Sequence, residues 1–179
     1  MDFKQLFLST EGRIGRQRWW IGAIGLALVN ILVSLIVLPV IGLGGPNLAA
    51  MIAAQDDPAA LSAALLAATQ SAAWASLVLF LVFAYPGYCL SVKRRHDKNN
   101  DGRDVLAYFA VTAVLMLIQA LGLGYTVEDM NGVPVPTPTL LYSVIGIVVG
   151  IFGIYLLVVL GFLKGTKGDN SYGPDPLRS

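Results

Sequence analysis

Long apolar stretches without a charged residue are the feature that most limits what this chain can fold into. Residues 19–55 contain no Asp, Glu, Lys or Arg, and their most apolar part, residues 20–43, would rise about 36 Å as an α-helix. That length crosses the roughly 30 Å hydrocarbon core of a bilayer. A secretory signal peptide is the alternative, but its apolar region is typically only about 7–15 residues long. We therefore predict an uncleaved transmembrane helix.

A second uncharged stretch covers residues 58–92. As one helix it would be about 52 Å long, which is too long for a single crossing. We therefore expect it to divide into a short alanine-rich helix over 58–70 and a span over 71–92. Asp57 followed by Pro58 is typical of a helix start, because Asp caps the first free N–H groups and Pro fits the first helical position.

Two further spans are predicted at residues 105–124 and 140–163, each close to or above the roughly 20 residues that a crossing needs. Residues 125–139 connect them and contain Pro134, Pro136 and Pro138. Because proline lacks the backbone N–H of a helix, this segment is predicted to be an extended, solvated loop.

The basic residues are confined to three of the five segments outside the spans. These three segments hold all twelve Lys and Arg residues: Lys4, Arg13, Arg16 and Arg18; Lys93, Arg94, Arg95, Lys98 and Arg103; Lys164, Lys167 and Arg178. The charged residues of the other two segments are all acidic. Since Lys and Arg are retained in cytoplasmic loops, this distribution orients the chain.

The fold class is therefore predicted as an all-α membrane protein, a four-transmembrane-helix bundle in a single domain with both termini cytoplasmic. Residues 1–19, 93–104 and 164–179 would be cytoplasmic, and residues 44–70 and 125–139 extracytoplasmic. The apolar residues at positions 3 and 6–8 further predict a short N-terminal interfacial helix.

Composition excludes several functions. A net charge of +1 gives no basic excess for binding a nucleic acid. The single cysteine, Cys89, and the single histidine, His96, argue against a disulfide, a metal site or a bound cofactor. Asp97-x-Asn99-x-Asp101-Gly102 matches the start of an EF-hand loop, but Tyr108 stands where the loop needs a bidentate Glu. We interpret that match as accidental.

Three polar segments border the predicted spans on the cytoplasmic side. Residues 11–20 place three arginines before two tryptophans, which suits lipid phosphates and headgroup anchoring, although membrane anchoring alone would explain them. Residues 93–97 are Lys-Arg-Arg-His-Asp, which could bind an anion or simply fix the topology. Residues 164–176 are rich in turn formers and predict either a folded turn or a disordered tail.

The topology brings these three segments to one membrane face, and we predict that they form a single polar platform. Asp97 and Asp175 are expected to pair with arginines, and Tyr172 to pack near Trp20. The platform would bind an anionic lipid headgroup or a protein partner. Its residues are predicted to be Arg13, Arg16, Trp20, Arg94, Arg95, His96, Asp97, Asn170, Tyr172 and Asp175.

The span interiors contain no ionisable Asp, Glu, Lys, Arg or His, which argues against proton-coupled transport. A small transporter or channel subunit for a lipid or neutral solute is the alternative function. His96 beside Asp97 could form an acid–base pair, but no nucleophile accompanies them, so no catalytic residue is assigned and an enzyme is not predicted. Glycines at 146, 150 and 153 would allow close helix packing within the bundle or a homo-oligomer.

Three motifs in this order resemble a known family. They are Gly12-Arg13-Ile14-Gly15-Arg16 with Trp20, then residues 93–97, then the Gly-Thr-x-Gly-x-Asn-x-Tyr-Gly-x-Asp-Pro run at 165–176. Together they resemble the bacterial inner-membrane family catalogued as domain of unknown function 805. The resemblance covers nearly the whole chain and implies a multi-pass protein of the bacterial cytoplasmic membrane without an established activity. Residues 101–104 depart from it, since members often have a Ser-Gly-Trp element after the His-Asp pair.

Overall fold

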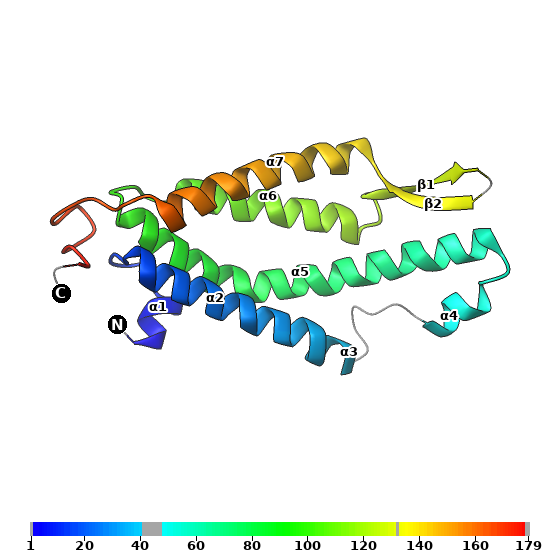
Figure 1. The fold of residues 1–179 in the computed structure, drawn as a ribbon, viewed down its shortest axis with the longest axis horizontal. Coiled ribbons are helices and arrows are strands. Elements are labelled where there is room, and N and C mark those ends of the chain that lie inside the picture. The colour runs from blue at the N-terminus through cyan, green and yellow to red at the C-terminus, as the bar shows by residue number, and fades with distance from the viewer. Residues whose placement is uncertain (1, 41–47, 132, 178–179) are drawn as a thin grey trace. The chain divides into compact units, whose positions relative to one another are not determined.

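The computed structural model describes residues 2–40, 48–131 and 133–177, which are mostly helical (Figure 1). The elements, in chain order and with η for a π-helix, are α1 (Phe3–Leu8), α2 (Arg16–Leu32), η1 (Val33–Val37), α3 (Leu38–Val40), α4 (Leu48–Ala53), α5 (Pro58–His96), α6 (Arg103–Ala120), β1 (Tyr125–Met130), β2 (Val133–Pro138), α7 (Leu140–Leu157) and η2 (Val158–Phe162).

Four helical segments in the described residues are long and apolar enough to cross a membrane. They are Arg16–Val40, Pro58–His96, Arg103–Ala120 and Leu140–Phe162, with mean hydropathies of 2.7, 1.8, 1.5 and 2.8. The prediction of four spans is confirmed, and the chain is a multi-pass membrane protein. The predicted end of the first span at residue 43 lies outside the described residues.

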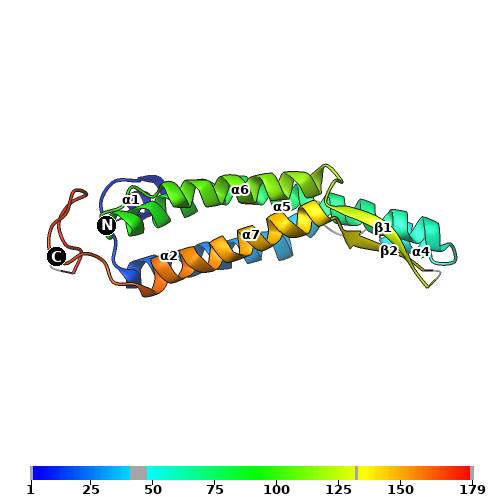
Figure 2. The same ribbon diagram turned by 90° about the horizontal axis from the view of Figure 1, so that it is seen from above.

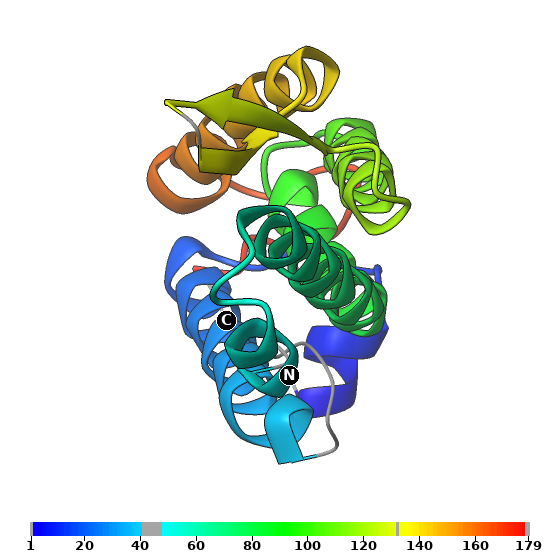
Figure 3. The same ribbon diagram turned by 90° about the vertical axis from the view of Figure 1, so that its right-hand side faces the viewer.

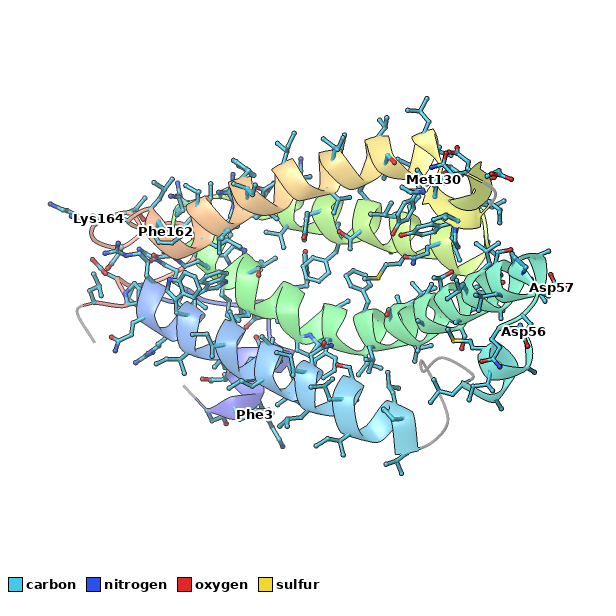
Figure 4. The ribbon with its side chains drawn as sticks, turned by 45° about the vertical axis from the view of Figure 1, so that its right-hand side comes forward. Phe3, Asp56, Asp57, Met130, Phe162 and Lys164 are labelled. Atoms are coloured by element: carbon cyan, nitrogen blue, oxygen red, sulfur yellow. The ribbon has the colours of Figure 1, made fainter. Side chains whose placement is uncertain are left out.

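The second span differs from the prediction, because α5 is one helix from Pro58 to His96 with no break near residue 71. Asp57 caps its start as expected, accepting hydrogen bonds from the N–H groups of Ala59 at 2.9 Å and Ala60 at 3.3 Å. Figure 4 places Asp57 at this helix start. Alanine is the best helix former, so nothing in the alanine-rich part ends the helix. At about 58 Å, α5 is longer than the hydrocarbon core, so the alanine-rich segment is helical but continuous with the span.

The predicted extended loop is a β-hairpin in which β1 and β2 pair antiparallel, as Figure 3 shows. Thr139 donates its N–H to the Gly124 carbonyl at 2.9 Å. Because hydrogen-bonded pairs alternate along an antiparallel ladder, this bond puts residues 134, 136 and 138 of β2 in non-hydrogen-bonded pairs. Their missing N–H groups therefore point away from β1. The prolines that argued against regular structure are compatible with this strand.

The chain forms two compact units. The first comprises Met1–Ile31, Leu81–Val111 and Val149–Ser179, and the second comprises Leu32–Phe80 and Thr112–Val148. The three segments predicted to be cytoplasmic all fall in the first unit, where both chain ends lie at the same end (Figures 1 and 2).

The core of the first unit is built from all four long helices together with the N-terminal segment. Its buried members are Phe7, Ile14, Trp19, Leu90, Val92, Val105, Leu156 and Leu160. Helix α1 confirms the predicted N-terminal helix, and the Lys93 ammonium holds it by donating to the carbonyls of Gln5 and Leu6. One face of α1 buries Phe7, while Phe3 remains exposed (Figure 4).

In the second unit, side-chain amides link α5, α6 and α7. Gln70 donates to the Ala120 carbonyl at 3.0 Å, and the Tyr142 hydroxyl donates to Gln119 Oε1 at 2.8 Å. Ala73 and Leu77 are buried against Ala120. The polar side chains of Gln70, Gln119 and Tyr142 are therefore satisfied by neighbouring helices, which suits the lack of water in a bilayer.

The approach of α2 to α5 depends on a glycine. A Cβ at Gly22 would lie 2.8 Å from Cδ1 of Leu90, whereas a Cβ at Gly25 on the same helix would meet nothing within 4 Å. We expect Gly22→Ala to lower the free energy of unfolding by about 1–2 kcal/mol, because buried Leu90 has little room to move. Gly25→Ala is the matched control and should be neutral or stabilising, since alanine favours a helix. Thermal unfolding of both purified variants in detergent checks this, and equal midpoints would contradict it.

Candidate functional site

Two buried arginines share one buried carboxylate at the end of α5. Arg13 Nη2 lies 3.0 Å from Asp97 Oδ1, and Arg94 pairs with Asp97 Oδ2. The three residues retain exposed fractions of only 5% for Arg13, 0% for Arg94 and 4% for Asp97. Buried charges need partners, because removing an ion from water costs several kcal/mol. The expected pairing of Asp97 with arginines is therefore present, and its carboxylate joins segments 84 residues apart in sequence.

Arg13 also holds the C-terminal segment. Its guanidinium donates to the carbonyls of Gly168 at 2.8 Å, Thr166 at 2.9 Å and Gly173 at 3.1 Å. Asp175 closes the same turn by accepting the Gly168 N–H at 2.9 Å. The segment is therefore a folded turn docked on α5, in agreement with one of the two predictions for it. An Asp175–arginine pair stays a prediction.

Four consecutive carbonyls at the end of the fourth span receive side-chain hydrogen bonds. Arg94 Nε donates to Leu160 O at 2.8 Å and Arg94 Nη2 to Leu163 O, while Trp20 Nε1 reaches Gly161 O at 3.1 Å and Arg16 Nη1 reaches Phe162 O at 3.0 Å. The last carbonyls of a helix lack backbone partners and carry negative partial charge, so cationic donors suit them. Arg16 and Trp20 are thereby tied to the end of η2.

His96, Asn170 and Tyr172 form a second contact between α5 and the C-terminal turn. The rings of His96 and Tyr172 stack with centroids 3.9 Å apart, and Asn170 Nδ2 donates to the His96 carbonyl at 2.9 Å. His96 Nδ1 lies 3.1 Å from the Gly12 carbonyl, so this nitrogen carries the proton and donates. Tyr172 therefore packs on His96, and Trp20 makes an edge contact with Phe162, with centroids 5.8 Å apart. The packing of Tyr172 near Trp20 stays a prediction.

Arg95 points to a different set of partners. It pairs with Asp104 at 2.9 Å and donates to Asn100 Oδ1 at 3.2 Å. The Tyr155 hydroxyl donates to the same Asp104 carboxylate at 3.1 Å. Arg95 therefore fixes the loop between α5 and α6 and does not join the Arg13–Asp97–Arg94 cluster.

An open cleft of about 970 Å³ lies beside this cluster. Its lining consists of Gly15, Arg16, Gln17, Arg18, Trp20, Asp97, Gly161, Lys164, Gly165, Thr166, Lys167, Asp175, Pro176 and Leu177. Sequence reasoning missed Gln17, Arg18, Lys164 and Lys167 as site residues. Their position immediately beside the apolar spans was the available signal. Figure 4 shows Lys164 just beyond Phe162, with its side chain extending away from the ribbon.

Several cations lie close together at the end of α5. Partial burial lowers the pKa of the Lys98 ammonium below its ordinary value, and the nearby cations Arg94 and Arg95 lower it further, although Asp97 acts in the opposite direction. An anion would reduce this repulsion among cations. In the described residues, no group of three His, Cys, Asp or Glu side chains is placed to hold a metal ion.

The fold and this cluster define a four-span membrane protein whose N-terminal, middle and C-terminal polar segments are tied together by buried arginines. The chain belongs to the family described as "Protein of unknown function (DUF805)", whose family model matches residues 7–174. The expected family membership is thereby confirmed. No curated protein and no solved structure gave a significant match.

Asp97 should be essential for stability. We expect Asp97→Asn to lower the free energy of unfolding by about 3–5 kcal/mol, because it leaves two buried guanidiniums without their counter-charge. Asp101→Asn in the same loop is the matched control. Asp101 pairs with Arg103, whose side chain is 89% exposed, so the loss there should be about 1 kcal/mol or less. Thermal unfolding in detergent compares the two variants, and a similar midpoint for both would contradict the structural role of Asp97.

Proposed function

We propose that this protein is a non-enzymatic membrane module whose cytoplasmic cleft binds an anionic lipid headgroup. The observation that carries the proposal is the placement of exposed cations around the cleft at the ends of two membrane spans. Arg18 lies in the first turn of α2, and Lys164 and Lys167 follow η2. Anionic headgroups are concentrated at this depth of a bilayer, and Lys and Arg side chains attract them.

The basic residues divide into two groups with different roles. Arg13 and Arg94 are buried, and every guanidinium nitrogen of each donates an internal hydrogen bond, so they are poorly placed to bind a ligand. Within the described part of the chain, no carboxylate pairs with Arg18, Lys164 or Lys167. These exposed cations are therefore available to an external anion. We propose them as the ligand-binding residues in place of the buried arginines Arg13 and Arg94.

The backbone amides at the start of α2 add an electrostatic field that favours a bound anion. Its first helical hydrogen bond from the N-terminal side is Trp19 N–H to Gly15 O at 3.1 Å, and no acidic side chain occupies the first turn. The preceding amides of Arg16, Gln17 and Arg18 lie at the positive end of the helix dipole. Such amides stabilise phosphate groups when cationic side chains are nearby.

The surroundings of the cleft suit a lipid better than a soluble anion. Trp20 lines the cleft at the start of a span, where indole rings favour the headgroup level. Leu177, on the same lining, is 87% exposed. An exposed leucine beside cations suits a boundary between headgroups and acyl chains.

We further propose that the membrane is the bacterial cytoplasmic membrane, with the cleft and both termini in the cytoplasm. The support is the distribution of Lys and Arg, none of which lies in residues 44–70 or 125–139. A fluorescent protein that folds only in the cytoplasm, fused after residue 179, should fluoresce in bacterial cells. An alkaline phosphatase that folds only outside, inserted at Asn131, should be active. The reverse pattern would overturn this orientation.

Lipid selectivity tests the proposed function. The full chain, purified in a mild detergent, is titrated with phosphatidylglycerol or phosphatidylcholine, and bound lipid is counted by native mass spectrometry. We expect selective binding of phosphatidylglycerol. The double variant Lys164→Gln, Lys167→Gln should weaken it about 10- to 30-fold, since each cation contributes about 1 kcal/mol.

The matched control is the double variant Lys4→Gln, Arg103→Gln, which removes the same charge from exposed positions outside the cleft. It should change the affinity less than about twofold. Equal losses in the two double variants would mean diffuse charge attraction without a site. Equal binding of the two lipids would reject the proposed function.

A further inference from the structure

Charge balance in the cleft indicates more than one phosphate. The cleft is lined by four basic residues and two carboxylates, so the lining carries a net charge of +2. The basic residues are Arg16, Arg18, Lys164 and Lys167, and the carboxylates are Asp97 and Asp175. The carboxylates are already engaged: Asp97 by Arg13 and Arg94, and Asp175 by the N–H groups of Gly168 and Leu177. A headgroup with a single phosphodiester would neutralise only half of the net charge.

The cations come from two segments that line the cleft, and we call these segments its two walls. Arg16 and Arg18 belong to the first turn of α2, and Lys164 and Lys167 belong to the segment after η2. The Arg16 bond to the Phe162 carbonyl joins the two walls at 3.0 Å. The arginine wall also offers the first-turn amides of α2, so each wall can hold a phosphate of its own. Arginine suits bidentate contact with a phosphate, and lysine acts as a point charge.

The volume of the cleft agrees with a larger headgroup. Its 970 Å³ lies near the upper end of the range of about 300–1,000 Å³ for pockets that hold drug-sized ligands. One phosphate would leave most of this space to water. Two phosphates joined directly or through a short bridge would reach both walls at once.

Resting on the proposed function, we infer that the ligand of this cleft is a lipid whose headgroup carries two phosphate groups. Each wall holds one phosphate, and Trp20 and Leu177 border the acyl chains. Two lipid classes share this chemistry: those in which glycerol bridges the phosphates, and those with a directly linked diphosphate.

The experiment compares ligands on the full chain in mild detergent by native mass spectrometry. The probes are phosphatidylglycerol, diphosphatidylglycerol, a polyprenyl diphosphate and inorganic diphosphate. We expect at least one of the two-phosphate lipids to bind 10-fold or more tightly than phosphatidylglycerol, and inorganic diphosphate to bind more weakly than that lipid. Whichever two-phosphate lipid binds more tightly identifies the class.

Single variants test the two walls separately. Arg18→Gln and Lys167→Gln should each weaken the two-phosphate lipid about 5-fold or more, since each cation contributes about 1 kcal/mol. Phosphatidylglycerol, with its single phosphate on the lysine wall, should weaken about 5-fold for Lys167→Gln but less than 2-fold for Arg18→Gln. Arg103→Gln, an exposed charge outside the cleft, should change neither.

The outcomes separate this inference from the proposed function. If phosphatidylglycerol binds selectively over phosphatidylcholine but as tightly as both two-phosphate lipids, the two-phosphate inference is overturned and the proposed function stands. If inorganic diphosphate binds as tightly as the lipids, the acyl chains add nothing to the affinity and the cleft does not select a lipid. This result also overturns the inference. If no anionic lipid binds better than phosphatidylcholine, both are overturned.

Discussion

The carboxylate of Asp97, shared by two buried guanidiniums, is the interaction on which the polar end of the first unit depends. Arg94 comes from the same helix as Asp97, whereas Arg13 precedes α2. The Asp97 backbone carbonyl also accepts the N–H of Thr166 at 2.8 Å. One residue therefore fixes the N-terminal segment, the end of α5 and the C-terminal turn. A buried ion cluster of this kind contributes little net stability compared with apolar packing, but removal of one partner is costly. Its contribution here is to specify a single arrangement of three segments.

This arrangement creates the cleft. Arg94 bonds to Leu160 and Leu163, so it places the end of η2 next to Asp97. Arg16 and Trp20 then attach the first turn of α2 to the same helix end. Cations that would repel one another at the end of a span are held by carbonyls and one carboxylate. Arg18, Lys164 and Lys167 stay exposed on the rim, where no carboxylate of the described residues pairs with them.

The features that one physical constraint governs could be predicted from the sequence. Apolar length predicted the four spans, and the Asp57–Pro58 pair predicted the start of α5. The predicted division of α5 was wrong, because bilayer thickness limits the part of a helix that lies in the hydrocarbon but not the length of the helix itself. The hairpin was not predicted, because a proline such as Pro134 fits a strand only where its missing N–H is not needed for pairing. Which positions those are depends on the register with β1, and the register is known only once the two strands are paired.

For the site, the sequence predicted the convergence of three segments but not how charge is divided among them. The motifs drew attention to Arg13, Arg94 and Asp97, and these turn out to bind one another. Whether an arginine is buried or exposed depends on packing that no local pattern encodes. Arg13 and Arg16 are separated by two residues, yet Arg13 is buried against Asp97 while Arg16 lies exposed on the cleft.

The family motifs therefore describe how the polar end of the first unit folds. A Cβ at Gly165 would overlap the Asp97 carboxylate and come within 2.8 Å of the Asp97 carbonyl oxygen, so a glycine is needed where the C-terminal turn crosses the end of α5. Asn170 likewise has a structural role, because its side chain donates a hydrogen bond to the His96 carbonyl. Arg18, Lys164 and Lys167, the proposed ligand-binding residues, lie at positions outside the motif residues. A chain could keep this architecture and change its ligand by altering only those exposed positions, because their side chains contribute nothing to the buried cluster that holds the fold together.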